Sequence, residues 1–149
     1  YLKHETEVWF EVTTLLIPGY NDSGSELEKL SCWMVEQLGP EVPLHFSAFH
    51  PDWKMRDVER TPHQTLIRAR EIALANGIHH VYLGNVHDHQ GSSTYCHACG
   101  QILIGRDWYV LSDWNLDSQG RCSNCLAPCP GHFESTPGSW GSRRQPVQV

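Results

Sequence analysis

The sequence has little positive charge. Its 149 residues include 11 Lys and Arg against 17 Asp and Glu, which gives a formal net charge of −6. Proteins that bind nucleic acid usually carry a basic surface for the phosphates, so this balance argues against a nucleic-acid partner.

Long apolar runs are also missing. No run approaches the roughly 18 residues that a membrane-spanning helix needs, and no charged-then-apolar secretory leader opens the chain. We therefore expect a cytoplasmic protein without a membrane partner. Because the sequence begins at Tyr1 and not at Met, we also expect that an N-terminal portion is missing.

Three segments are predicted to be strands. Val8–Ile17 is almost continuously apolar and β-branched, which is typical of a strand buried on both faces. Leu44–Phe49 and His80–Val86 are the other two, and His87–Ser93 is predicted to be a polar linker.

Two amphipathic helices are predicted between these strands. The first has Ser23 as its cap, Glu26 three residues later, and Gly39 at its end. The second starts with Thr61, followed by Pro62. Strands that alternate with such helices form a parallel sheet, and right-handed crossovers place both helices on one side. Three strands alone would leave an open edge beside the first strand and uncovered apolar surface, so the sequence looks like the end of a larger sheet.

Four of the six cysteines form two Cys-x-x-Cys pairs, Cys96 with Cys99 and Cys122 with Cys125. The spacing between the pairs slightly exceeds the roughly 15–20 residues of the usual zinc pattern. Two such pairs supply four thiolates in a closed tetrahedral shell, which is typical of structural zinc. An iron ion would use the same ligands, and disulfides would be the alternative in a secreted protein.

A small zinc ribbon is expected over residues 94–133, with a hairpin of Gln101–Ile104 and Trp108–Leu111 around residues 105–107. About 40 residues cannot bury enough apolar surface to fold alone, so the metal is expected to stabilise this unit. A closed shell has no open coordination position, and we assign no catalytic residue. Cys129 and His132 follow Cys125 closely in the sequence. One of them could be a replacement or fifth metal ligand, or both could lie near the site without binding the metal. The stretch 134–149, rich in Ser, Gly and Pro, is predicted to be a disordered tail.

Three segments of the front half carry a more specific pattern. They read VWFEVTTLLIPGYNDS (Val8–Ser23), PLHFSAFHPDWKM (Pro43–Met55) and TPHQTLIRAREIALANGIHHVYLGNV (Thr61–Val86). Together with the cysteine pairs, they resemble the C-terminal half of a radical S-adenosylmethionine family of the AmmeMemoRadiSam system, whose members are similar to pyruvate formate-lyase activating enzymes. The resemblance covers roughly residues 1–133.

This resemblance implies an α/β fold in which residues 1–90 form the C-terminal part of a partial (β/α)6 barrel, followed by the zinc ribbon. Family members hold a 4Fe-4S cluster in a Cys-x3-Cys-x2-Cys loop. They cleave S-adenosylmethionine to a 5′-deoxyadenosyl radical that takes a hydrogen atom from a substrate or partner protein. The 149 residues contain no Cys-x3-Cys-x2-Cys. We therefore expect a C-terminal fragment or truncated product of a radical oxidoreductase, inactive without its N-terminal half, with S-adenosylmethionine and the 4Fe-4S cluster bound only by the full-length protein.

The resemblance also implies cofactor contacts. His50 follows the second predicted strand, where related enzymes carry a histidine near the adenosine. The alternative is a loop histidine with local hydrogen bonds. Thr13 and Thr14 lie where related enzymes place a polar group for the carboxylate of S-adenosylmethionine. The alternative is that their hydroxyls form hydrogen bonds within a buried strand.

A second function stays open, in which the zinc ribbon is a protein-binding module without catalysis.

Overall fold

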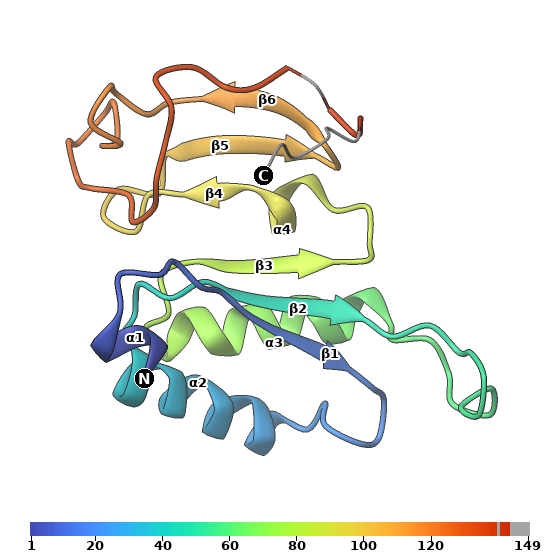
Figure 1. The fold of residues 1–149 in the computed structure, drawn as a ribbon. Coiled ribbons are helices and arrows are strands. Elements are labelled where there is room, and N and C mark those ends of the chain that lie inside the picture. Colours follow the sequence, from blue (N-terminus) through green and yellow to red (C-terminus); the bar gives the residue numbers. More distant parts are fainter. Residues whose placement is uncertain (140, 144–149) are drawn as a thin grey trace. The chain divides into compact units, whose positions relative to one another are not determined.

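The computed structural model describes residues 1–139 and 141–143, which divide into two compact units, residues 1–91 and the residues from Ser92 onward. The first unit contains helices and a parallel sheet, and the second is built on a small antiparallel sheet (Figure 1).

The sheet of the first unit has the order β1-β2-β3, and its parallel strands are β1 (Val12–Leu16), β2 (Leu44–Ala48) and β3 (Val81–Gly84). Helices α2 (Gly24–Leu38) and α3 (His63–Ala75) pack against each other on one face of this sheet, and the short α1 (Leu2–Glu5) precedes β1 (Figure 1). The parallel sheet with both helices on one side is confirmed. Within the described residues, its three strands do not close into a barrel.

The start of α2 follows the predicted capping pattern. The Ser23 hydroxyl accepts a hydrogen bond from the backbone N–H of Glu26 at 3.3 Å and donates one to its carboxylate at 2.7 Å. This reciprocal pair satisfies a backbone donor that the helix itself leaves unpaired. Gly39 ends the helix with φ 87°, a conformation that glycine adopts without strain.

The start of α3 differs from the prediction. Pro62 is the capping residue, α3 begins at His63, and no side chain caps it. The hydroxyl of Thr61 instead donates to the carbonyl of Leu16 at 2.6 Å and accepts from the backbone N–H of Phe49 at 2.8 Å. Thr61 is buried, and the two strand ends hold unpaired polar groups that need a partner. It therefore joins the ends of β1 and β2.

The core of the first unit lies between the helices and the sheet. Alternate strand residues point to this face, because side chains alternate along a strand. Its buried members include Leu16, Leu44, Phe46, Val81 and Leu83 from the strands and Leu27, Met34, Leu66, Ala69 and Ala73 from the helices.

The prediction that Val8–Ile17 is buried on both faces is wrong. The strand covers only Val12–Leu16, Val8 is 59% exposed, and Leu15 is 44% exposed. The reason is that β1 is an edge strand and that the helices cover one face only. The open edge and uncovered apolar surface expected for a three-stranded sheet are therefore present.

In the second unit, β4 (Thr94–Tyr95), β5 (Ile102–Asp107) and β6 (Val110–Trp114) form an antiparallel sheet in that order. The four-residue helix α4 (His89–Ser92) lies within the predicted linker 87–93.

The hairpin turn starts three residues later than predicted. β5 continues through Asp107, which pairs with Val110, and Trp108 and Tyr109 form the turn. Gly105 lies within β5, where any Cβ would clash with the side chains of Ser112 and Asp113 on the neighbouring strand. The glycine therefore permits a close approach of strands and does not make the turn.

None of the described helices has the length and apolar character needed to cross a membrane. Of the predicted tail 134–149, residues 140 and 144–149 lie outside the described residues.

Substituting Thr61 by valine should lower the free energy of unfolding of the first unit by about 2 kcal/mol, because a buried N–H and a buried C=O lose their shared partner. Thr61→Ser keeps the hydroxyl and should retain most of the stability. Urea unfolding followed by far-ultraviolet circular dichroism checks both. A Thr61→Val protein as stable as the wild type would contradict the bridging role.

Candidate metal centre

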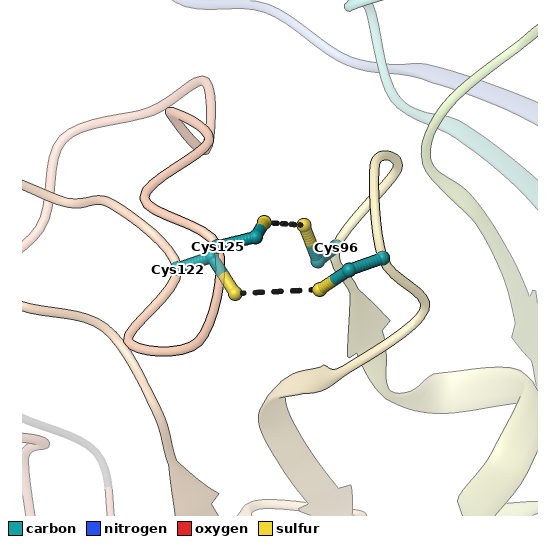
Figure 2. A group of neighbouring side chains, drawn as sticks. Cys96, Cys122 and Cys125 are labelled. Atoms are coloured by element: carbon teal, nitrogen blue, oxygen red, sulfur yellow. Dashed lines mark hydrogen bonds between the residues drawn. The ribbon is translucent and has the colours of Figure 1, made fainter.

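The four predicted cysteine ligands lie together in the second unit. Cys96 and Cys99 occupy the connection between β4 and β5, and Cys122 and Cys125 lie in the loop after β6. Their sulfur atoms all lie within 4.8 Å of one another. The sulfurs of the labelled Cys96, Cys122 and Cys125 turn inward from the two loops (Figure 2). The Sγ–Sγ distances are 3.5 Å for Cys96–Cys125 and 3.7 Å for Cys99–Cys122. The structure therefore brings together all four residues that the spacing singled out.

These distances fit a tetrahedral shell around one metal ion. Four sulfurs at about 2.3 Å from a zinc ion are separated by about 3.8 Å along each edge of the tetrahedron. A disulfide needs sulfurs at about 2.05 Å, so both pairs are too far apart to be bonded. Zinc would thus be held by Cys96, Cys99, Cys122 and Cys125, with no ligand position left open.

The two Cys-x-x-Cys loops share one backbone pattern. In the first, the N–H of Cys96 donates to Gln101 and its carbonyl accepts from Gly100, at 2.8 and 2.9 Å. In the second, Cys122 makes the same two bonds with Ala127 and Leu126, both at 2.9 Å. The loops are therefore two copies of one turn, and each presents two sulfurs to the same point.

The fifth residue of each copy has a positive φ. Gly100 has φ 74° and Leu126 has φ 63°. A residue with a side chain pays roughly 1–2 kcal/mol in this region because its Cβ crowds the following carbonyl. Leu126 is also 58% exposed, so burial of its side chain does not offset this strain.

Hydrogen bonds divide the charge unevenly among the thiols. The backbone N–H of Gln101, followed by the side-chain amide of Asn124, lowers the pKa of Cys99 to about 6. The backbone N–H of Ala127 favours the thiolate of Cys125, but the neighbouring cysteine sulfurs and lost solvation outweigh it and raise the pKa to about 12. At neutral pH a metal ion must displace the Cys125 proton, so metal affinity falls as the pH is lowered.

Cys129 lies near this centre but outside the four-sulfur group. It is 8% exposed and packs in the core of the second unit, and its thiol lies 3.9 Å from the carbonyl of Pro130. Its backbone N–H donates to Gly120 at 2.9 Å. These contacts describe a buried core cysteine beside a complete set of ligands.

The structure does not bring the predicted cofactor contacts together. Thr13 is exposed on the open face of the sheet, whereas Thr14 is half-buried on the helix face with Phe46. His50 is exposed beyond the carboxyl end of β2, and no described residue hydrogen-bonds its side chain. Ligands of parallel sheets usually sit at that end of the strands, where His50 lies.

The open face carries a polar row that sequence reasoning missed. Thr13, His45 and Tyr82 stand side by side on the three strands, and the rings of His45 and Tyr82 are 4.9 Å apart. Glu11 lies 2.5 Å from His45. The alternation of apolar and polar residues in Leu44–Ala48 could have predicted that one face of the sheet is polar.

The chain is similar to a protein of Methanocaldococcus jannaschii named "Uncharacterized protein MJ0808". The two are 45% identical over 119 residues, which are 79% of this chain and 36% of the relative. The chain thus spans little more than a third of the curated relative that it matches. No family model matches the sequence, and no solved structure matches it.

Removing one ligand should abolish the metal centre. Cys122→Ala should lose the one zinc ion per chain and the folded structure of the second unit, since three thiolates leave the shell incomplete. Cys129→Ala should keep one zinc ion, and Cys32→Ser is a matched control in the first unit. Elemental analysis and amide spectra check this. If Cys129→Ala lost as much zinc as Cys122→Ala, Cys129 would be a metal ligand.

Gly100 and Leu126, which occupy the same position in the two Cys-x-x-Cys turns, allow a paired test of the backbone strain at positive φ. Gly100→Ala should destabilise the zinc-bound unit by roughly 1–2 kcal/mol through its φ alone, because nothing lies within 4 Å of the added Cβ. Leu126→Gly should leave stability unchanged or raise it by up to about 1 kcal/mol. Gly24→Ala, at the ordinary start of α2, is the control. Equal losses for Gly24→Ala and Gly100→Ala in denaturant titrations would rule out the strain.

Proposed function

We propose that this chain is the C-terminal portion of a radical S-adenosylmethionine enzyme similar to activating enzymes, and that it is inactive alone. In the whole protein, a 4Fe-4S cluster would supply the electron that cleaves S-adenosylmethionine. The cluster and its ligands belong to an N-terminal half that would complete the sheet. The observation that carries the proposal is the order of the three front-half motifs, followed by the two cysteine pairs.

The shape of the first unit supports this assignment. Three parallel strands with both connecting helices on one face are the geometry of consecutive units of a (β/α) barrel. Within the part of the chain that the structure describes, the outer edge of β1 has no partner strand, so a further strand can add there. The polar row of Thr13, His45 and Tyr82 lies on the face that a barrel would turn inward. The relative extends well beyond the matched region, which also agrees with a longer protein.

The four-cysteine centre does not suit the catalytic cluster. Each thiolate of a 4Fe-4S cluster binds a different iron, which spreads the sulfurs further than a shell around one ion does. Here all four sulfurs lie within 4.8 Å. No reaction step is therefore assigned to Cys96, Cys99, Cys122 or Cys125, and their role in this proposal is structural.

The gene product that contains this chain, purified without oxygen and supplied with iron and sulfide, tests the proposal. With a strong reductant it should convert S-adenosylmethionine to 5′-deoxyadenosine, whereas the 149-residue chain should form none above background. Chromatography of the nucleoside products measures this. Cluster assembly and cleavage by the 149 residues alone would contradict the assignment, and so would a whole gene product that forms no 5′-deoxyadenosine.

One observation favours a second function, the protein-binding module. The tip of the β5–β6 hairpin exposes three consecutive apolar side chains, Trp108 at 60%, Tyr109 at 66% and Val110 at 62%. Aromatic residues are enriched at protein interfaces. A gene product that binds zinc but neither holds a cluster nor cleaves S-adenosylmethionine would favour this module over the enzyme.

A further inference from the structure

A pocket of about 430 Å³ lies in the first unit, and none of the residues that line it is a predicted metal ligand. One wall comes from residues 60–63 at the start of α3, and the other from Val86 and His87 after β3. Both segments follow carboxyl ends of strands, and the arrows of Figure 1 show that the three strands end at the same edge of the sheet. Small ligands of open α/β sheets bind outside this edge.

Three nitrogen-bearing side chains, Arg60, His63 and His87, line the pocket. Pro62 and Val86 provide its apolar wall, and the hydroxyl of Thr61 is already engaged by the ends of β1 and β2. The lining residues include no carboxylate. A guanidinium, imidazole nitrogens and apolar surface in one pocket suit a small organic molecule that ends in an anionic group.

Asp88, an acid that contacts the lining residue His63, has hydrogen-bond partners of its own. Asp88 lies 2.7 Å from Nε2 of His63 and accepts a hydrogen bond of 2.7 Å from the N–H of Gly91. Burial raises the pKa of Asp88, but these bonds outweigh it and lower the pKa below its usual value, so the carboxylate is ionised. It therefore orients the ring of His63 through one nitrogen.

No carboxylate in the described part of the chain pairs with the guanidinium of Arg60. Its guanidinium makes one long hydrogen bond of 3.5 Å, to the carbonyl of Asn85, and takes part in no ion pair among the described residues. A guanidinium presents five donors in a planar fork that binds two oxygens of one phosphate at once. Arg60 is thus the group in the pocket with the most unused capacity for an anion.

We propose that this pocket binds the phosphate group of a small phosphate monoester. Arg60 holds two phosphate oxygens, while His63 and His87 line the site around the phosphate. Pro62 and Val86 contact the organic part, which the volume accommodates beside the phosphate. The site stands independently of the proposed radical chemistry and uses none of the metal ligands.

Titration of the zinc-loaded chain with inorganic phosphate, followed by amide nuclear magnetic resonance at constant ionic strength, tests this proposal. The amides of His63 and His87 should shift in a saturable manner with a dissociation constant on the order of millimolar. Arg60→Gln should weaken binding about tenfold. Arg56→Gln removes the same charge from the same loop outside the pocket lining and should change binding less than twofold.

Several outcomes would overturn the site. Equal losses in Arg56→Gln and Arg60→Gln would mean attraction by net charge only, and an unchanged affinity in Arg60→Gln would remove the residue on which the site depends. Acetate binding as tightly as phosphate would exclude the phosphate class. The amide spectrum of each variant reports its folding, and each outcome can occur whether or not the whole protein cleaves S-adenosylmethionine.

Discussion

The convergence of four cysteine sulfurs on one point is the constraint on which the second unit depends. Three of the six buried residues in its core cluster, Cys96, Cys122 and Cys129, are cysteines, and only Leu103, Ile104 and Leu116 are aliphatic. So small an apolar core cannot offset the entropy of ordering the chain around it. Metal–thiolate bonds at the four cysteines would replace the missing burial, since binding free energy becomes folding free energy when the site forms only on folding. One ion shared by the two Cys-x-x-Cys loops would therefore hold the β4–β6 sheet in place.

The first unit is stabilised in a different way. Its core is mainly apolar and lies on one side of the sheet, where α2 and α3 cover alternate residues of all three strands. The other side has polar groups in exact register, and the β1 edge has no partner strand among the described residues. A parallel sheet is ordinarily covered on both faces. The open face is therefore the part of this unit whose sequence is least explained by the fold of the unit alone.

The sequence predicted the features that depend on local chemistry. The Cys-x-x-Cys spacing identified all four sulfurs, and the Ser23–Glu26 spacing identified the start of α2, because both patterns act within a few residues. Predictions from the sequence were wrong where a residue interacts with a segment distant in the chain. Thr61 is a residue type that often caps helices, but its hydroxyl hydrogen-bonds the ends of β1 and β2 instead. Gly105 is a residue type that often forms turns, but it lies within a strand because β6 approaches it closely. Thr13, Thr14 and His50 could be placed on or after a strand, but not on a face, without knowing which side the helices cover.

The carboxyl edge of the sheet shows why residue type alone does not identify a binding site. Asn21 accepts from the N–H of Ile17 and donates to the carbonyl of Leu15, and Asn85 donates to the carbonyl of Ala48. With Thr61, these side chains close the polar ends of the strands, where buried backbone groups would otherwise remain unpaired. Side chains used in this way have less hydrogen-bonding capacity left for a ligand. Recognition at this edge therefore falls mainly to groups that the strand ends use little. Among the described residues, Arg60, with one long hydrogen bond to Asn85, and His50 meet this condition. The polar residues that hold the sheet and those that can bind at its edge are thus different residues, even though they lie on the same loops.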